Sequence, residues 1–230
     1  MKHGKKYLAS AAKRTHSEQV SLEQAVALVK SMAFAKFDET VEVAIRLNLK
    51  SKHTVRDTLV LPHGFRAEKK ILVFAKGDKA EEARANGAAY VGDQDLIEKI
   101  QGGWLDFDIA VATPDMMKDV GKLGQVLGRR GLMPNPKTKT VTFDVKGAVE
   151  ELKKGRVEFK ADKSGVVHMA IGKVSMEAEK IVENARLLLQ EVLRKRPADL
   201  KGEYIRSIAM SSTMGPGVRV NAKEKFEGSK

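Results

Sequence analysis

The chain has 230 residues, of which 42 are Lys or Arg and 30 are Asp or Glu, so its formal net charge is +12 and its sequence pI is ≈ 9.7. It contains no cysteine, which excludes a disulfide framework, a thiolate metal site and a cysteine nucleophile. Hydrophobic residues make up 42% of the chain, which is enough for a packed core. Because no apolar stretch suits a signal peptide or a bilayer span, we expect a cytoplasmic protein with no membrane partner.

The positive charge is concentrated at the two ends of the chain. Residues 1–67 hold 12 basic and 6 acidic side chains, residues 159–230 hold 14 and 9, and residues 68–158 hold 16 and 15. Polyphosphate partners are bound mainly through neutralised charge, so we expect the two ends to bind nucleic acid together. The alternative is a solvated, lysine-rich surface without such a partner. Aromatic residues are only 5% of the chain, so base stacking is not expected to be the main binding mode.

The first segment begins with a polar, basic arm that runs to about Gln19. A helix is expected from Ser21, where Gln24 completes a capping box. Strict alternation of apolar and polar residues predicts a half-buried strand over 40–47. A second strand is expected over 58–61.

The middle segment, residues 68–158, has the rhythm of alternating strands and helices. Its first apolar run is continuous, which is typical of a strand covered on both faces. The rhythm therefore predicts parallel strands with helices on both sides of the sheet. Strands are expected over 71–75, 89–91 and 107–112, and helices over 78–86, 93–101 and from Pro114.

In the last segment, residues 157–161 and 166–171 flank the turn sequence Asp162–Gly165 and predict an antiparallel hairpin. A long amphipathic helix is expected from Ser175, and a final strand over 204–212. Neither end has enough strands for a good sheet alone, so we expect both to form one domain. The predicted fold is a discontinuous two-layer α+β domain (1–67 plus 159–230) with an inserted α/β domain (68–158), joined by hinge segments near 66–70 and 155–160.

The sequence offers little for catalysis. The middle segment has neither a Gly-x-Gly-x-x-Gly turn nor a phosphate-binding loop, and the histidines lack metal-ligand spacing. Asp106 and Asp108 flank a strand start, where solvated or capping carboxylates are common. We therefore expect no enzyme, no cofactor and no metal. Two alternatives stay open: a nucleotide-dependent enzyme that uses the middle domain, and a nucleic-acid chaperone without sequence preference.

The last strand carries an unusual face. Ile205, Ser207, Ala209, Ser211 and Thr213 share it, and after the isoleucine every side chain is small and most carry a hydroxyl. Such a face lets a bulky polar ligand approach closely and donates hydrogen bonds to phosphate, sugar or base edges. An ordinary solvated sheet face is the alternative. The turn that follows, Thr213-Met-Gly-Pro-Gly, is rich in glycine and proline and holds a methionine where core packing does not obviously need it.

Three segments resemble a known family: Ala35-Lys-Phe-Asp-Glu-Thr-Val-Glu-Val, Gly128-Arg-Arg-Gly-Leu-Met-Pro-Asn-Pro-Lys and Ser212-Thr-Met-Gly-Pro. They are similar to the signature segments of the ribosomal L-one family, the protein of the mobile stalk on the tRNA exit side of the large subunit. The resemblance implies that the domain built from both termini carries the main ribosomal RNA site. It also implies that a Rossmann-like, three-layer insert moves on a hinge.

The resemblance further implies a role in the movement and release of deacylated tRNA at the exit site. In bacteria it implies repression of the protein's own operon through a similar structure in the messenger RNA. We therefore expect a ribosome-bound structural protein that is monomeric when free.

The resemblance assigns RNA binding to residues whose chemistry suits it. Lysines can pair with phosphates, hydroxyls can bond 2′-hydroxyl groups, and the glutamate can accept from a sugar or base. Apolar side chains can pack against sugars, and glycine permits close backbone approach. Phe37 has a core-edge alternative, and Lys36 has a solvated one. The expected residues are Lys36, Phe37, Thr40, Glu42, Gly172, Lys173, Ser175, Ser207, Thr213, Met214 and Gly215.

The segment 128–137 is expected to be a loop on the insert. Arg129, Arg130 and Lys137 give this neutral domain a basic point. Two interpretations stay open: a secondary contact to tRNA or other RNA, or a structural loop stiffened by its prolines.

Overall fold

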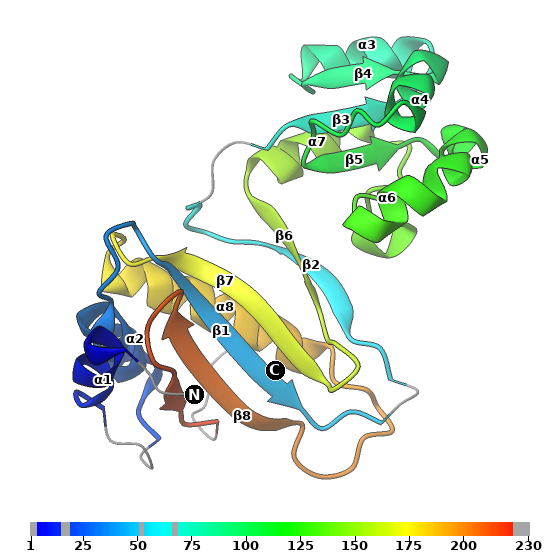
Figure 1. Cartoon of the computed structure of the whole chain (residues 1–230). Coiled ribbons are helices and arrows are strands. Elements are labelled where there is room, and N and C mark those ends of the chain that lie inside the picture. The colour runs from blue at the N-terminus through cyan, green and yellow to red at the C-terminus, as the bar shows by residue number, and fades with distance from the viewer. Residues whose placement is uncertain (1–3, 15–18, 51–52, 66–68, 223–230) are drawn as a thin grey trace. The chain divides into compact units, whose positions relative to one another are not determined.

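The computed structural model describes residues 4–14, 19–50, 53–65 and 69–222, and the chain divides into two compact units (Figure 1). Unit 1 combines residues 1–65 with 159–230, and unit 2 spans residues 66–158. The domain bounds expected from charge and sequence texture, 1–67 plus 159–230 and 68–158, stay a prediction. Part of the expected first hinge, residues 66–68, lies outside the described residues.

Unit 1 is built on a four-stranded antiparallel sheet with the strand order β7-β1-β8-β9. The strand β1 (Thr40–Leu47) lies between β7 (Val166–Lys173) and β8 (Ile205–Ser212), and the short β9 (Val218–Val220) pairs with β8. Because β1 comes from the N-terminal part and its neighbours from the C-terminal part, this sheet forms only when the two ends of the chain fold together.

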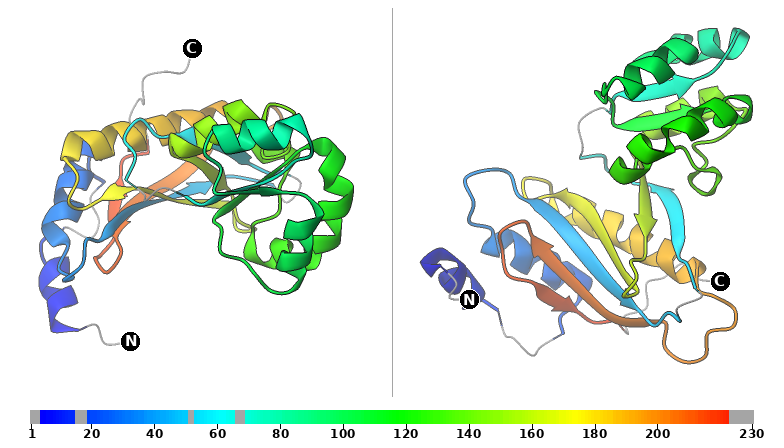
Figure 2. Two further views of the ribbon diagram at one scale, coloured as in Figure 1. Left: turned by 90° about the horizontal axis from the view of Figure 1, so that it is seen from above. Right: turned by 45° about the vertical axis from the view of Figure 1, so that its right-hand side comes forward.

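Two helices cover one face of this sheet, as Figure 2 shows from above. They are α2 (Leu22–Met32) and α8 (Ala178–Arg194), and the predicted capping box at Ser21 is present. The apolar residues of β1 point toward these helices and are buried, whereas its polar residues lie on the other face. The short helix α1 (Lys5–Ala11) adjoins the end of α2, since Ser10 Oγ donates to the carbonyl oxygen of Met32.

Unit 2 is a three-layer α/β unit, as predicted. Its parallel sheet has the order β4-β3-β5, with β3 (Ile71–Phe74) in the centre between β4 (Tyr90–Gly92) and β5 (Ile109–Ala112). All of β3 is buried, because one set of its side chains packs with α4 and α6 and the other set packs with α3 and α7. The surrounding elements are α3 (Asp78–Ala85), α4 (Gln94–Gln101), η1 (Pro114–Met116), α5 (Met117–Val120), η2 (Gly121–Leu123), α6 (Gly124–Arg130), η3 (Pro136–Thr138) and α7 (Val145–Lys153).

The expected hairpin is wrong. β6 (Arg156–Lys160) pairs with β2 (Arg56–Val60) in a two-stranded sheet, and a single bridge from Ala161 to Val167 joins it to β7. The turn does form, since Asp162 Oδ1 accepts from the backbone amides of Ser164 and Val166 at 2.8 Å. Local turn chemistry therefore reverses the chain, but β7 pairs with β1, where its apolar face is buried against α8.

Other differences are smaller. The helix α1 lies within the segment expected to be a polar arm, and α8 begins three residues after Ser175. Neither β9 nor α7 was expected. In the described part of the chain, no helix is both long and apolar enough to cross a membrane.

Candidate nucleic-acid interface

The face of the unit 1 sheet opposite the helices is polar and carries small side chains. Register places Glu42 of β1 opposite Ser211 of β8, and Arg46 opposite Ser207. Glu42, Arg46 and Ser207 are exposed, and Ala209 is half-buried. The small-residue face of the last strand is therefore accessible, as its pattern predicts.

Three segments from distant parts of the sequence meet at one end of this sheet. They are residues 34–38 before β1, residues 173–175 after β7 and residues 213–215 after β8. Strand register brings them together, because Thr40 lies opposite Lys173 and Val41 lies opposite Ser212. Most of the expected RNA-binding residues lie at this end, which we call the loop end of the sheet. Ser207 is the exception. It lies on β8 six residues before Thr213, which corresponds to roughly 20 Å between the two residues along an extended strand.

Lys173 and the two threonines form one hydrogen-bonded group at the loop end. Lys173 Nζ donates to Thr40 Oγ1 at 2.8 Å and to the carbonyl oxygen of Asp38 at 3.4 Å. Thr213 Oγ1 accepts from the backbone amide of Thr40 at 2.9 Å and donates to its carbonyl oxygen at 3.3 Å. The Thr40 hydroxyl thus keeps its proton for an outside acceptor, and the ammonium keeps a third donor. The Thr213 hydroxyl, in contrast, mainly ties its turn to β1.

Asp38 holds the segment that precedes α8. Its Oδ1 accepts from the backbone amide of Ser175 at 3.1 Å, and its Oδ2 accepts from Ser175 Oγ at 2.8 Å. The serine hydroxyl can still accept a hydrogen bond from a ligand, but its proton is already used.

Two large apolar side chains are exposed at the loop end. Phe37 is 56% exposed and Met214 is 52% exposed, and in the described part of unit 1 the other large apolar side chains that are exposed are Leu8 and Val60. The core-edge interpretation of Phe37 therefore does not hold. Exposed apolar side chains beside cations and hydroxyls favour a contact surface for a ligand with both charged and apolar parts. Lys36, which directly precedes Phe37, is also exposed.

The structure gives both expected glycines a packing role. A Cβ atom on Gly172 would lie 3.0 Å from Ile181 Cγ1 and 3.3 Å from Met176 Sδ, so this glycine faces α8 and not the open face. A Cβ atom on Gly215 would overlap Ser212 Oγ. Glycine therefore suits the packing at both positions without any ligand. Gly172 is buried, whereas Gly215 is half-buried and leaves its backbone accessible to a ligand.

Sequence reasoning missed Glu39, which contacts all three segments of the loop end. Its side chain is only 1% exposed. Oε1 accepts from the backbone amides of Phe34 at 2.9 Å and Ala35 at 2.7 Å, and Oε2 accepts from the backbone amide of Met214 at 3.0 Å. The backbone carbonyl oxygen of Glu39 accepts from the amide of Val174 at 2.9 Å. The one available signal was alternation, which puts Glu39 on the buried side with Val41.

The Glu39 carboxyl stays ionised despite its burial. Burial raises its pKa, but the nearby Ser212 hydroxyl and the hydrogen bonds from the three backbone amides lower the pKa by a larger amount, so the net shift is downward. Ser212 Oγ lies near the carboxylate without making a hydrogen bond of ordinary geometry, so the amides are the anchoring contacts.

In unit 2, the segment expected to be a loop is partly helical. Gly128, Arg129 and Arg130 form the last turn of α6, which Gly131 ends with a φ of 70°. Both arginines are exposed, whereas the side chain of Lys137 is outside the described part of the structure.

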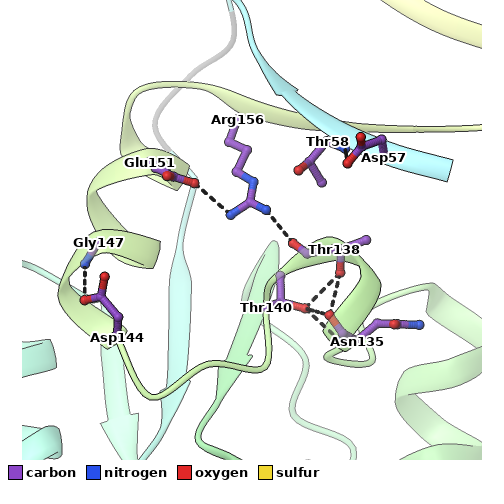
Figure 3. A network of polar contacts seen from close by, with 9 residues as sticks. All are labelled: Asp57, Thr58, Asn135, Thr138, Thr140, Asp144, Gly147, Glu151 and Arg156. Atoms are coloured by element: carbon purple, nitrogen blue, oxygen red, sulfur yellow. Dashed lines mark hydrogen bonds and ion pairs between the residues drawn. The ribbon is translucent and has the colours of Figure 1, made fainter. Parts of the chain in front are cut away.

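The far end of this segment is held by a buried arginine (Figure 3). Arg156 donates through Nη2 to the carbonyl oxygen of Thr138 at 2.7 Å and through Nη1 to Glu151 at 3.0 Å. The backbone amide of Asn135 donates to Thr140 Oγ1 at 2.8 Å. These contacts favour the structural interpretation for residues 135–140 and leave the exposed arginines of α6 as the basic point of unit 2.

A hollow of about 430 Å³ lies on the outer side of the helix layer of unit 1. Its lining is largely acidic, with Glu23, Glu179 and Glu183 beside Arg186 and Val182. Negative side chains repel phosphate, so this hollow does not suit a nucleotide. In the described residues, no group of three or more His, Asp or Glu side chains could hold a metal ion.

Comparisons with known proteins identify the family of the chain. Residues 29–216 match the ribosomal protein L1p/L10e family. The chain is 63% identical over 223 residues to the large ribosomal subunit protein uL1 of Treponema denticola, with 97% of this chain and 99% of the relative covered. It is 58% identical to the proteins of the same name from Borrelia duttonii (96% and 98% covered) and Treponema pallidum (98% and 100% covered). The chain therefore belongs to the ribosomal protein L1p/L10e family.

Proposed function

We propose that this chain is a structural constituent of the large ribosomal subunit and is bound to the ribosome in the cytoplasm. It binds large-subunit ribosomal RNA with the loop end of its unit 1 sheet. The relatives over nearly the whole chain are named large ribosomal subunit proteins, which supports the ribosomal role. The family is a structural one, and we assign no catalytic activity to the chain.

One observation carries the RNA site. Three segments from both ends of the chain converge on one end of an open sheet face and present Lys36, Lys173, Thr40, Phe37 and Met214 together. Cations provide phosphate contacts, the threonine hydroxyl provides a donor for a 2′-hydroxyl or base edge, and the apolar pair covers sugars or bases. This combination suits a folded RNA better than a uniform duplex, because single-stranded and bulged regions expose phosphates, 2′-hydroxyl groups and bases together.

The finer roles belong to the same proposal. The protein assists the movement and release of deacylated tRNA at the exit site, with unit 2 as the moving part on the segments that join it to unit 1. The exposed arginines of α6 are the part of unit 2 best suited to a tRNA phosphate. The RNA-binding face also binds a similar structure in the messenger RNA of its own operon and represses its translation.

The test is a binding titration with fragments of large-subunit ribosomal RNA over a range of salt concentrations. Lys36→Gln and Lys173→Gln should each weaken binding. Each should also reduce the steepness of log affinity against log salt by the amount that one phosphate contact contributes, about one. The matched control is Lys201→Gln, an exposed lysine before the start of β8, at the opposite end of that strand from the loop end. It should leave affinity and slope unchanged.

Three results would contradict the proposal. Equal affinity for all RNAs would favour the chaperone alternative, and tight saturable binding of a free nucleotide in a thermal-shift assay would favour the enzyme alternative. Equal effects of the loop-end and control lysines would place the RNA site elsewhere.

A further inference from the structure

We infer that Glu39 is a positioning residue for RNA binding, which holds the three segments of the loop end in one arrangement without touching the RNA itself. The inference rests on the proposed function and deepens it, since it names the group that organises the site.

The side chain of Glu39 links two parts of the chain that are far apart in sequence, residues 34–35 and Met214. One carboxylate oxygen binds the 34–35 backbone and the other binds the Met214 backbone, between 2.7 and 3.0 Å. The exposed side chain of Phe37 lies two residues after the bonded amide of Ala35, and the exposed side chain of Met214 belongs to the residue whose own amide is bonded. The carboxylate therefore fixes the spacing between the two apolar contacts, which come from opposite ends of the sequence.

The main chain of Glu39 adds the third segment. Its carbonyl oxygen accepts from Val174, directly between Lys173 and Ser175. The hydroxyl of the next residue, Thr40, accepts a hydrogen bond from Lys173 Nζ, and the backbone amide of Thr40 donates one to Thr213 Oγ1. Cation, hydroxyl and apolar groups are thus all set by the residue pair 39–40 at the start of β1.

Burial separates this role from direct contact. A side chain that is 1% exposed cannot reach a ligand, and a carboxylate is rarely buried so deeply unless its oxygens are satisfied. A buried negative charge beside a polyanion site would oppose binding, so its presence is explained by the amide donors that it collects. Pre-organised loops bind more tightly because less ordering remains to be done when the ligand arrives.

Glu39→Gln is a sharp test because it keeps the shape of the side chain and changes one oxygen to an NH2 group. Whichever way the amide is turned, NH2 faces a backbone N–H donor on one of the two loops. One loop therefore loses its anchor, whereas the sheet that carries it is unchanged. The expected result is an RNA affinity lower by about ten-fold, with a smaller change at higher temperatures, where both loops are loosened.

A structural control separates positioning from general destabilisation. Val192 on α8 is also fully buried, and it lies near the C-terminal end of the helix, roughly 20 Å along the helix axis from Ala178, where the helix begins beside the loop end. Val192→Ala should lower the unfolding midpoint at least as much as Glu39→Gln. At a temperature where all three proteins are folded, its RNA affinity should stay within about two-fold of the wild type.

Hydrogen exchange of the free proteins gives a readout that a merely structural role would not move. In Glu39→Gln, the amides of Met214 or of Phe34 and Ala35 should exchange faster while the amides of the β1–β8 ladder keep their protection. Unchanged loop exchange would overturn the inference, and so would Glu39→Gln binding RNA as well as the wild type. If the wild type itself bound no large-subunit RNA, the proposed function would fail first, and the role of Glu39 in binding with it.

Discussion

Removing the hydroxyl of Thr213 is expected to weaken RNA binding through the protein's own structure. The hydroxyl accepts from the Thr40 amide at 2.9 Å and donates to the Thr40 carbonyl at 3.3 Å. The first bond has ordinary length and is worth about 1 kcal/mol net, whereas the second lies at the long end and adds about 0.5 kcal/mol or less. Thr213→Ala should therefore cost about 1–1.5 kcal/mol of turn anchoring, and water will recover part of this because the side chain is exposed.

The effect on RNA affinity should be larger than the effect on unfolding. The turn carries Met214, so a displaced turn loses that contact too, and we expect a total loss of about 1–3 kcal/mol in binding. That is about five-fold to 150-fold in the dissociation constant. The assay is RNA titration at physiological salt beside urea unfolding of the same samples.

Two further substitutions at Thr213 separate shape from hydrogen bonding. Thr213→Ser keeps the hydroxyl and should bind within about three-fold of the wild type, whereas Thr213→Val keeps the shape and should behave like Thr213→Ala. Wild-type affinity of Thr213→Val would refute the reasoning, because the hydrogen bonds to Thr40 would then contribute nothing.

The other predictions concern the apolar contact, the domain boundary and pH. Met214→Ala should lower RNA affinity by about 1–3 kcal/mol but unfolding stability by less than about 0.5 kcal/mol, because the side chain is 52% exposed, and a large loss of stability in urea would contradict this. A chain that joins residues 1–67 directly to 159–230 should fold and keep most of its RNA affinity, as circular dichroism and titration can check; an unfolded product would overturn the domain assignment. The lowered pKa of Glu39 implies stability that is fully present above its ordinary value of 4.5 and is lost as the pH falls through the lower folded-state value. The difference in unfolding free energy between the wild type and Glu39→Gln should therefore shrink on acidification below pH 4.5, and a difference independent of pH there would count against an ionised carboxylate.

The fold could be predicted from sequence wherever one local signal decided the structure. The alternation over residues 40–47 reports burial on one face, and the structure has the strand with the same bounds. The continuous apolar run at 71–74 reports burial on both faces, and β3 has helices on both sides. Capping chemistry located the start of α2 in the same way.

Prediction failed where distant parts of the chain decide the pairing. The turn at Asp162 forms, yet β6 and β7 join different sheets, since the choice of partner depends on which strand buries the apolar face. The helix α1 is only seven residues long, and contacts with the end of α2 stabilise it: Ser10 Oγ, for example, donates to the carbonyl oxygen of Met32. Isolated helices of this length are unstable, so its sequence alone carries almost no signal.

The candidate site shows the same division between surface and support. Residue chemistry and the family resemblance together mark lysines, hydroxyls and a methionine as ligand groups. At the loop end, Lys36, Thr213 and Met214 are exposed, whereas Thr40 and Lys173 are half-buried. Sequence does not mark the supporting group, because a buried glutamate at the start of a strand looks like any other charged residue in a polar segment. Only the fold brings the amides of residues 34, 35 and 214 to one carboxylate.

This arrangement couples folding to binding. β1 is the inner strand of the unit 1 sheet, so pairing its start with the ends of β7 and β8 requires the C-terminal part of the chain to be in place. The charge asymmetry of the sequence has the same physical basis, because the two basic ends must share one surface if they are to meet one polyanion. A ligand that spans segments from both ends binds only the folded chain, and such a ligand stabilises the fold by an amount that grows with the logarithm of its concentration over its dissociation constant. The neutral middle segment contributes none of the strands of that sheet, so its insertion between the ends does not interrupt the sheet that carries the candidate site.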